Sequence, residues 1–120
     1  MTGTPHLVKS ETQVNTTDGG QDQFQSRIAP LQDGGYVVVW TDLSLVYNPQ
    51  GGAIVGQRYD AAGNKVGGDP AHGGEVDLSQ FDSGDQSSPA VTTLANGNIA
   101  VAFVDFFSNG ITSNNGNIWV

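Results

Sequence analysis

The sequence predicts an all-β protein made of two four-stranded, propeller-like blades of about 63 residues each. Three observations lead to this fold class. The composition favours short strands and turns, a stretch of the chain recurs at a fixed offset, and each copy contains a continuous apolar run. The chain has 17 glycines, 37% hydrophobic residues and 13% charged residues, which is typical of strands joined by many turns. Compact apolar runs such as Tyr36–Trp40 argue against disorder.

The repeat becomes visible when the chain is shifted by 63 residues, because residues 22–42 then align with 85–105 without gaps. Six of these 21 positions are identical, and several of the others conserve an apolar residue or a turn former. The identical positions in the first copy are Asp22, Gln23, Leu31, Gly34, Val38 and Asp42. Core residues and turn formers are what a shared fold needs, so the two copies are expected to fold alike.

Each copy is expected to run through four strands. The first two are predicted at Ser26–Leu31 and Gly35–Thr41, repeated at Pro89–Leu94 and Asn98–Val104. Asp33-Gly34 and Asn96-Gly97 suit two-residue hairpin turns with the glycine at positive φ. The third is predicted at Ala53–Tyr59 and Asn117–Val120, and the fourth near Glu75–Leu78 and Thr12–Asn15.

The second strands are apolar throughout, which indicates that both faces of each sheet are covered. A two-sheet sandwich would show alternation, whereas blades stacked around an axis would not. Val38 and Val101 are therefore expected to be fully buried. Their neighbours Val37, Val39, Ala100 and Ala102 are expected to be mostly buried.

We interpret residues 1–120 as a single repeat domain. Residues 1–17 would supply a strand that completes a neighbouring blade, 18–80 the first repeat, and 81–120 a second, truncated repeat. Two blades cannot close a ring, so the expected partner is a further copy of the chain, in a homo-oligomer of two to four chains. A piece of a longer array is the other account, and the ring size stays open.

Charge and composition exclude several partners. The net charge is −8, and the cations are only Lys9, Arg27, Arg58 and Lys65, so binding of nucleic acid or an anionic membrane surface is not expected. No apolar run is long enough for membrane insertion. Cysteine is absent, which excludes disulfides and thiolate chemistry. The N-terminus shows no pattern of a cleavable signal peptide.

Two groups of side chains are candidates for binding. Asp18, Asp22, Asp82 and Asp85 lie in turn-like segments, where they could hold calcium weakly or accept backbone N–H bonds in Asx-turns. Tyr47, Phe106, Phe107 and Trp119 could stack on a ligand, or be buried between blades. His6 and His72 lack the spacing of a transition-metal site.

The segments of the repeat resemble the tandem repeats of large secreted bacterial proteins of the repeats-in-toxin (RTX) type. The segments concerned are Gln13-Val14-Asn15-Thr16-Thr17, Gly84-Asp85-Gln86-Ser87-Ser88-Pro89, Leu31–Trp40 and Gly56-Gln57-Arg58-Tyr59-Asp60-Ala61-Ala62-Gly63. The second copy departs from the pattern, since Phe103 replaces Trp and the Gln-Arg-Tyr-Asp element is missing. The resemblance implies a propeller-like repeat and an extracellular or cell-surface setting, and it implies no catalytic residue.

The expected function is therefore that of a non-catalytic binding or structural module of an extracellular bacterial protein. The most specific version of this expectation is a lectin-like module that binds sugars. No cofactor is required by the sequence, although calcium is compatible with it. The alternative is a glycan hydrolase with its site at the axis of a closed propeller. Glu11 and Glu75 could form its pair of carboxylates, although they also fit equivalent positions on an outer strand.

Overall fold

The computed structural model describes residues 10–16, 20–79, 84–106 and 116–120. In this part the chain forms two antiparallel sheets, confirming the all-β class. The first sheet has the order β1-β2-β3-β4, with β1 at Gln23–Pro30, β2 at Tyr36–Asp42, β3 at Ala53–Tyr59 and β4 at Val76–Asp77. The second has the order β5-β6-β7, with β5 at Asp85–Thr93, β6 at Ile99–Phe106 and β7 at Gly116–Trp119. A 3-10 turn, η1, spans Pro70–His72.

The strands lie close to the predicted positions, and β3 coincides with its prediction. The strand predicted at Thr12–Asn15 was wrong for the single chain, because residues 10–16 form no strand. This segment instead packs Val14 against the first sheet, and the Asn15 side-chain amide donates to Gln23 Oε1 at 3.0 Å. Burying Val14 on a sheet face takes the segment away from edge pairing.

The hairpin turns also differ from the prediction in length. Gly34 and Gly97 have positive φ, 85° and 88°, as expected. However, Leu31 pairs with Gly35 and Leu94 with Asn98, so each loop has three residues rather than two. The geometry is that of a turn closed by an i→i+3 bond and followed by a left-handed residue, which glycine adopts without strain. Asp33 and Asn96 each accept the backbone N–H two residues ahead, as in an Asx-turn.

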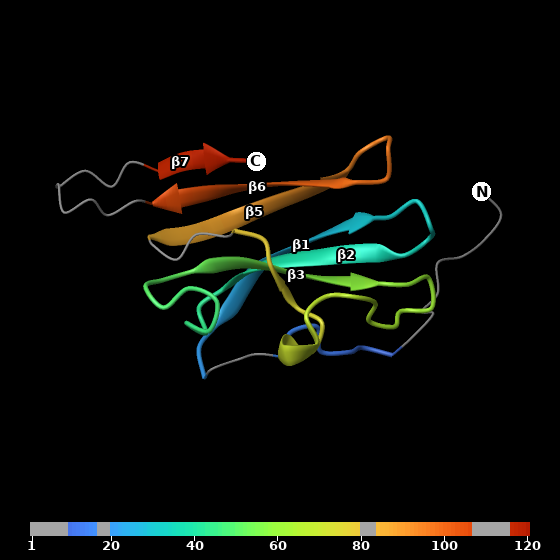
Figure 1. Cartoon of the computed structure of the whole chain (residues 1–120), viewed down its shortest axis with the longest axis horizontal. Helices are drawn as coiled ribbons and strands as arrows, with labels where there is room; N and C mark the ends of the chain where they lie inside the picture. The colour runs from blue at the N-terminus through green and yellow to red at the C-terminus, as the bar shows by residue number, and fades with distance from the viewer. Residues whose placement is uncertain (1–9, 17–19, 80–83, 107–115) are drawn as a thin grey trace.

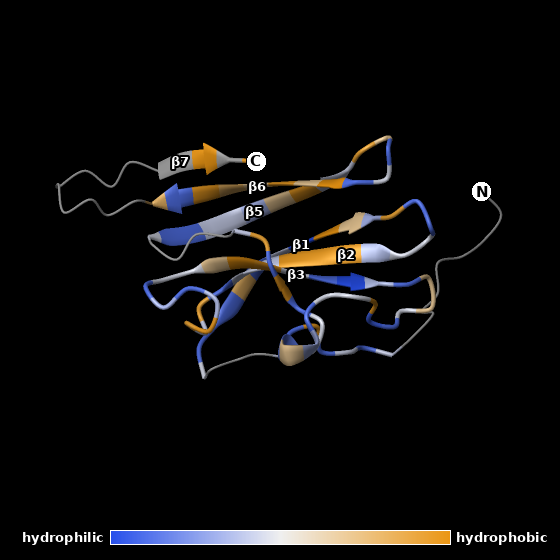
Figure 2. Cartoon of the chain, in the orientation of Figure 1, coloured by the Kyte–Doolittle hydropathy of each residue, from blue (hydrophilic) through white to orange (hydrophobic). Residues whose placement is uncertain are grey.

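The two sheets lie one on the other, with β5 next to β1 (Figure 1). Their shared core consists of Ala29, Val37 and Val39 from the first sheet, against which Val91, Ile99 and Val101 of the second sheet pack. Apolar residues gather in the middle of the strands and polar ones in the loops (Figure 2). Burial of these aliphatic side chains is the main favourable term that holds the repeats together.

Val38 and Val101 are only half-buried, so their predicted full burial was wrong. Val38 lies on the face of the first sheet away from the second, where it packs, like Val14 and Tyr47, against the buried cluster that contains Trp40. Val37 and Val39 face the second sheet and are buried as expected, whereas Ala100 and Ala102 are half-buried. In the first repeat, the strand that is apolar throughout therefore belongs to a sheet whose two faces are both covered by other residues.

Hydrogen bonds between the sheets join residues that are 63 positions apart. Gln25 Oε1 accepts the Ser88 N–H at 2.9 Å, and Gln32 Nε2 donates to the Ala95 carbonyl at 2.7 Å. The Thr93 hydroxyl donates to the Pro30 carbonyl. The second repeat thus lies on the first with equivalent positions in contact.

At the end of the stack opposite the hairpin turns, buried polar groups form a junction between the two repeats. Asn48, which is 1% exposed, places its side-chain nitrogen 2.9 Å from Gly52 O, Gly84 O and Gln86 Oε1. The Gly52 N–H donates to Asp85 Oδ1 at 2.7 Å, and the Gln86 N–H donates to Gly52 O at 3.0 Å. A Cβ at Gly52 would lie 2.5 Å from the Gln86 carbonyl oxygen, so this close approach requires glycine.

Candidate functional site

The two hairpin turns lie at the same end of the stack (Figure 1). Residues of both turns line a cleft between the two repeats. Its volume is about 590 Å³, within the usual range for small-molecule sites. Both repeats contribute to it. The lining residues are Leu31, Gln32, Asp33, Val37, Arg58, Gly97, Asn98 and Ile99.

A charged pair forms the rim on the side of the first repeat. Asp33 reaches it from the β1–β2 turn, and Arg58 from β3, where it pairs with Val37 and so shares the face that looks toward the second sheet. Arg58 Nη2 lies 2.5 Å from Asp33 Oδ2, and both side chains are about half exposed. The Gly35 N–H and the Arg58 guanidinium hold the pKa of Asp33 below its ordinary value of 3.8. The carboxylate is therefore charged at neutral pH and fixed in orientation by two donors.

Amide side chains of the two turns complete the cleft. Gln32 bridges the repeats through its bond to the Ala95 carbonyl, and Asn98 closes the β5–β6 turn with its backbone N–H on Asn96 Oδ1. Leu31, Val37 and Ile99 supply apolar surface between these polar groups. The cleft thus combines an apolar wall with an acid, a guanidinium and an amide at its rim.

The polar groups at the rim can form hydrogen bonds with a ligand. Among the residues that the structure describes, no group of three or more His, Asp or Glu side chains is placed to hold a metal ion. The Asp33 carboxylate is paired with Arg58, so it is held as an acceptor of hydrogen bonds. The rim therefore offers hydrogen-bond acceptors and donors to a polar ligand.

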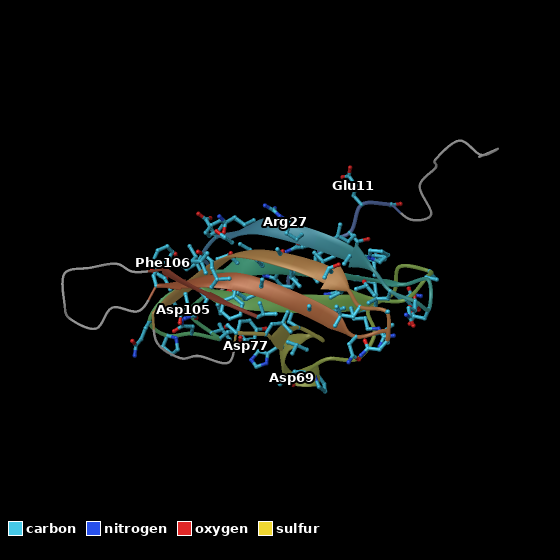
Figure 3. The ribbon with its side chains drawn as sticks, turned by 90° about the horizontal axis from the view of Figure 1, so that it is seen from above. Glu11, Arg27, Asp69, Asp77, Asp105 and Phe106 are labelled. Carbon is cyan, nitrogen blue, oxygen red and sulfur yellow. The ribbon has the colours of Figure 1, made fainter. Side chains whose placement is uncertain are left out.

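Of the aromatic residues proposed from the sequence, neither Tyr47 nor Phe106 lines this cleft. Tyr47 is half-buried on the opposite face of the first sheet, where its hydroxyl donates to Glu75 Oε2 at 2.6 Å. Phe106 is 40% exposed at the end of β6, away from the hairpin turns (Figure 3). Phe107 lies outside the described residues, as does the side chain of Trp119, whose backbone pairs with Phe103. Their role in ligand binding stays a prediction.

The four predicted calcium ligands are divided between the repeats. Asp85 accepts the Gly52 N–H, so one of its oxygens takes part in the junction between the repeats. Asp22 is exposed at the equivalent position of the first repeat. Asp18 and Asp82 lie outside the described residues. Calcium binding therefore stays a prediction.

Glu75, one of the two carboxylates considered for hydrolysis, is fully buried. Its Oε1 accepts the backbone N–H and the hydroxyl of Thr16, and its Oε2 accepts the Tyr47 hydroxyl. The Thr16 hydroxyl also lies 3.0 Å from the His72 carbonyl oxygen. Glu75 thus ties the N-terminal segment to the first sheet, while Glu11 is exposed.

Sequence reasoning treated Asp33 only as a turn former, and so did not anticipate the cleft or the junction. The available signal for the rim was the recurrence of a polar turn residue, Asp33 in the first copy and Asn96 in the second.

Comparisons of the chain with protein-family models, curated proteins and solved structures find no significant match. No helix in the described ranges is sufficiently long and apolar to span a membrane.

Proposed function

We propose that this chain is a non-catalytic binding module of an extracellular bacterial protein, and that the cleft between its repeats binds a neutral mono- or disaccharide. The observation that carries the proposal is the cleft itself, in which Asp33, Arg58 and Asn98 surround apolar side chains. Binding would require both repeats, since each contributes one of the two hairpin turns.

A neutral sugar fits the chemistry of these groups. A carboxylate accepts hydrogen bonds from adjacent hydroxyls, while guanidinium and amide groups donate to hydroxyl oxygens. The charges of Asp33 and Arg58 offset each other, so a strongly charged ligand gains little from the rim. The C–H faces of a sugar ring would lie on Leu31 and Ile99.

The wider setting rests on the sequence. The resemblance to RTX-type repeats supports a propeller-like architecture and an extracellular or cell-surface location. The stacked repeats are compatible with adjacent blades of a propeller, and we propose that the ring is completed in a homo-oligomer of two to four chains. Weak calcium binding would be an accessory property.

A glycan array tests the proposal, using the wild-type chain beside the variant Asn98→Ala. We expect binding to a small set of neutral sugars and its loss in the variant. Asn64→Ala, which alters an exposed asparagine outside the cleft, is the matched control and should bind like the wild type.

Amide chemical shifts would then locate the bound sugar, with changes expected at Asp33, Arg58 and Asn98. Shifts confined to the region of Tyr47 or Phe106 would refute the cleft as the site. Release of free sugar from the array hits would refute the non-catalytic function and favour a hydrolase.

A further inference from the structure

The interface between the repeats joins two different surfaces. The first repeat contributes the face of β1–β3 that carries Val37 and Val39, and the second contributes the face of β5–β6 that carries Val91 and Val101. Equivalent residues meet across it at a constant offset, as the bonds between Gln25 and Ser88 show. An interface of this kind is heterologous, so each repeat also has a second surface that could join a further repeat in the same way.

The second repeat leaves one of these surfaces open. The side of β6 and β7 that faces away from the first sheet is named here the outer face. It is defined by Ala100, Ala102, Val104 and Ile118. In the first repeat the equivalent positions Val37, Val39, Thr41 and Ile54 are at most 6% exposed. Ile118 pairs with Val104 as Ile54 pairs with Thr41, yet Ile118 is 71% exposed and Ile54 is 0% exposed.

The first repeat leaves the complementary surface open. The side of β1 and β2 that faces away from the second sheet is named here the far face. It is defined by Ile28 and Val38. Their equivalents Val91 and Val101 pack into the core between the sheets, whereas Ile28 is 64% exposed. A hollow of about 250 Å³ next to Val38 is lined by Val14, Phe24 and Trp40 among others. This hollow is large enough for a few side chains of a docked partner.

The sizes of the residues on the two open faces are complementary. On the outer face Ala100 and Ala102 replace Val37 and Val39, so this face carries smaller side chains. On the far face Ile28 replaces Val91, which makes it larger. A close-packed interface compensates small residues on one side with large ones on the other.

We propose that a second copy of this chain docks head to tail, with its far face on the outer face of the first copy and in the register of the intramolecular interface. Ile28 of one copy then packs against Ala100 and Ala102 of the next, as Val91 packs within the chain against the cluster that contains Val37 and Val39. This inference rests on the proposed homo-oligomer and names the surfaces that form it. Both faces of every copy are used, so the assembly closes as a ring when the rotation between successive copies divides a full turn.

Two single substitutions test the two faces separately. Ile28→Asp places a charge on the far face, and Ile118→Asp places one on the outer face; both side chains are exposed in the chain, so folding should be retained. Val66→Asp, on the turn after β3 and in neither set, is the matched control. Circular dichroism checks that every variant is folded, and sedimentation analysis at tens of micromolar chain measures its mass.

We expect the wild type and the control to form the same oligomer, and each face variant to be monomeric. An equimolar mixture of Ile28→Asp and Ile118→Asp should form dimers and nothing larger, because together the two chains retain one intact pair of faces. Wild-type chains that remain monomeric would overturn both the proposed oligomer and this inference. A wild-type oligomer that persists in the face variants, or a mixture without dimers, would overturn the head-to-tail interface and leave the oligomer standing.

Discussion

Gln25 and Ser88 occupy the same position in the two repeats and hydrogen-bond to each other, with the Ser88 N–H 2.9 Å from Gln25 Oε1. Each is a non-glycine residue at positive φ, 57° and 56°, where the pairing register of its strand shifts. Such bulges bend a strand and leave a residue unpaired in its own sheet. Here the unpaired positions of the two repeats are partners, so the irregularity of each strand helps to join them.

The first prediction concerns this contact. Gln25→Ala removes the acceptor for the Ser88 N–H and for the Thr41 hydroxyl, and should lower the free energy of unfolding by roughly 0.5–1.5 kcal/mol. Urea denaturation measures the loss. Gln21→Ala, at an exposed position just before β1, is the control and should leave the midpoint unchanged. Equal midpoints for the two variants would mean that the bulge contact contributes nothing.

A second prediction tests the hairpin turns. Gly34→Val should destabilise the chain by more than about 1 kcal/mol, because a β-branched residue is strained at a φ of 85°. A Cβ at this position meets only Ala61 Cβ at 3.4 Å, so the loss would arise from the backbone rather than from a clash. Gly34→Asn, which tolerates this conformation better, should lose less. Melting temperatures that rank asparagine below valine would refute the turn geometry.

The third prediction separates the two faces of β2. Val39→Ala should cost about 1–3 kcal/mol, because Val39 is 0% exposed between the sheets and its truncation leaves a cavity. Val38→Ala should cost less, since Val38 is half-buried on the opposite face. Urea midpoints for the two variants give the comparison. A larger loss for Val38 would contradict the observed orientation of the strand.

The fourth prediction concerns pH. The pKa of Asp33 in the folded chain is lowered by the Gly35 N–H and by Arg58, so its ionised form contributes stability above the ordinary pKa of 3.8. That contribution is lost as the pH falls through the lower, folded pKa. The melting temperature should therefore fall below about pH 4, and less steeply in Asp33→Asn. Identical pH profiles for the wild type and the variant would refute the pairing.

The strands could be predicted from the sequence because the signals for them are local. Apolar β-branched runs and glycine-containing turns determine β2, β3 and β6 without knowledge of the rest of the chain. The repeat added the expectation that both copies fold alike, and the equivalent pairings of β1 with β2 and of β5 with β6 agree with it.

The contacts between the repeats could not be predicted in the same way. Asn48, Gly52 and Asp85 have the sequence appearance of loop residues, and their roles depend on which loop the second repeat touches. The predicted burial of Val38 failed for a related reason, since apolar character alone does not say how much of a face is covered. The cleft could not be predicted because Asp33 and Asn98 come together only when the two turns lie side by side.

The two repeats form one stacked unit, and amide hydrogen exchange tests this stacking most directly. The backbone N–H groups of Gly52, Gln86 and Ser88 all donate across the boundary between the repeats. In a stacked unit these three amides should exchange as slowly as those in the middle of β2. If they exchange at the rate of exposed loops while β2 and β3 stay protected, the repeats are not stacked and the account is wrong.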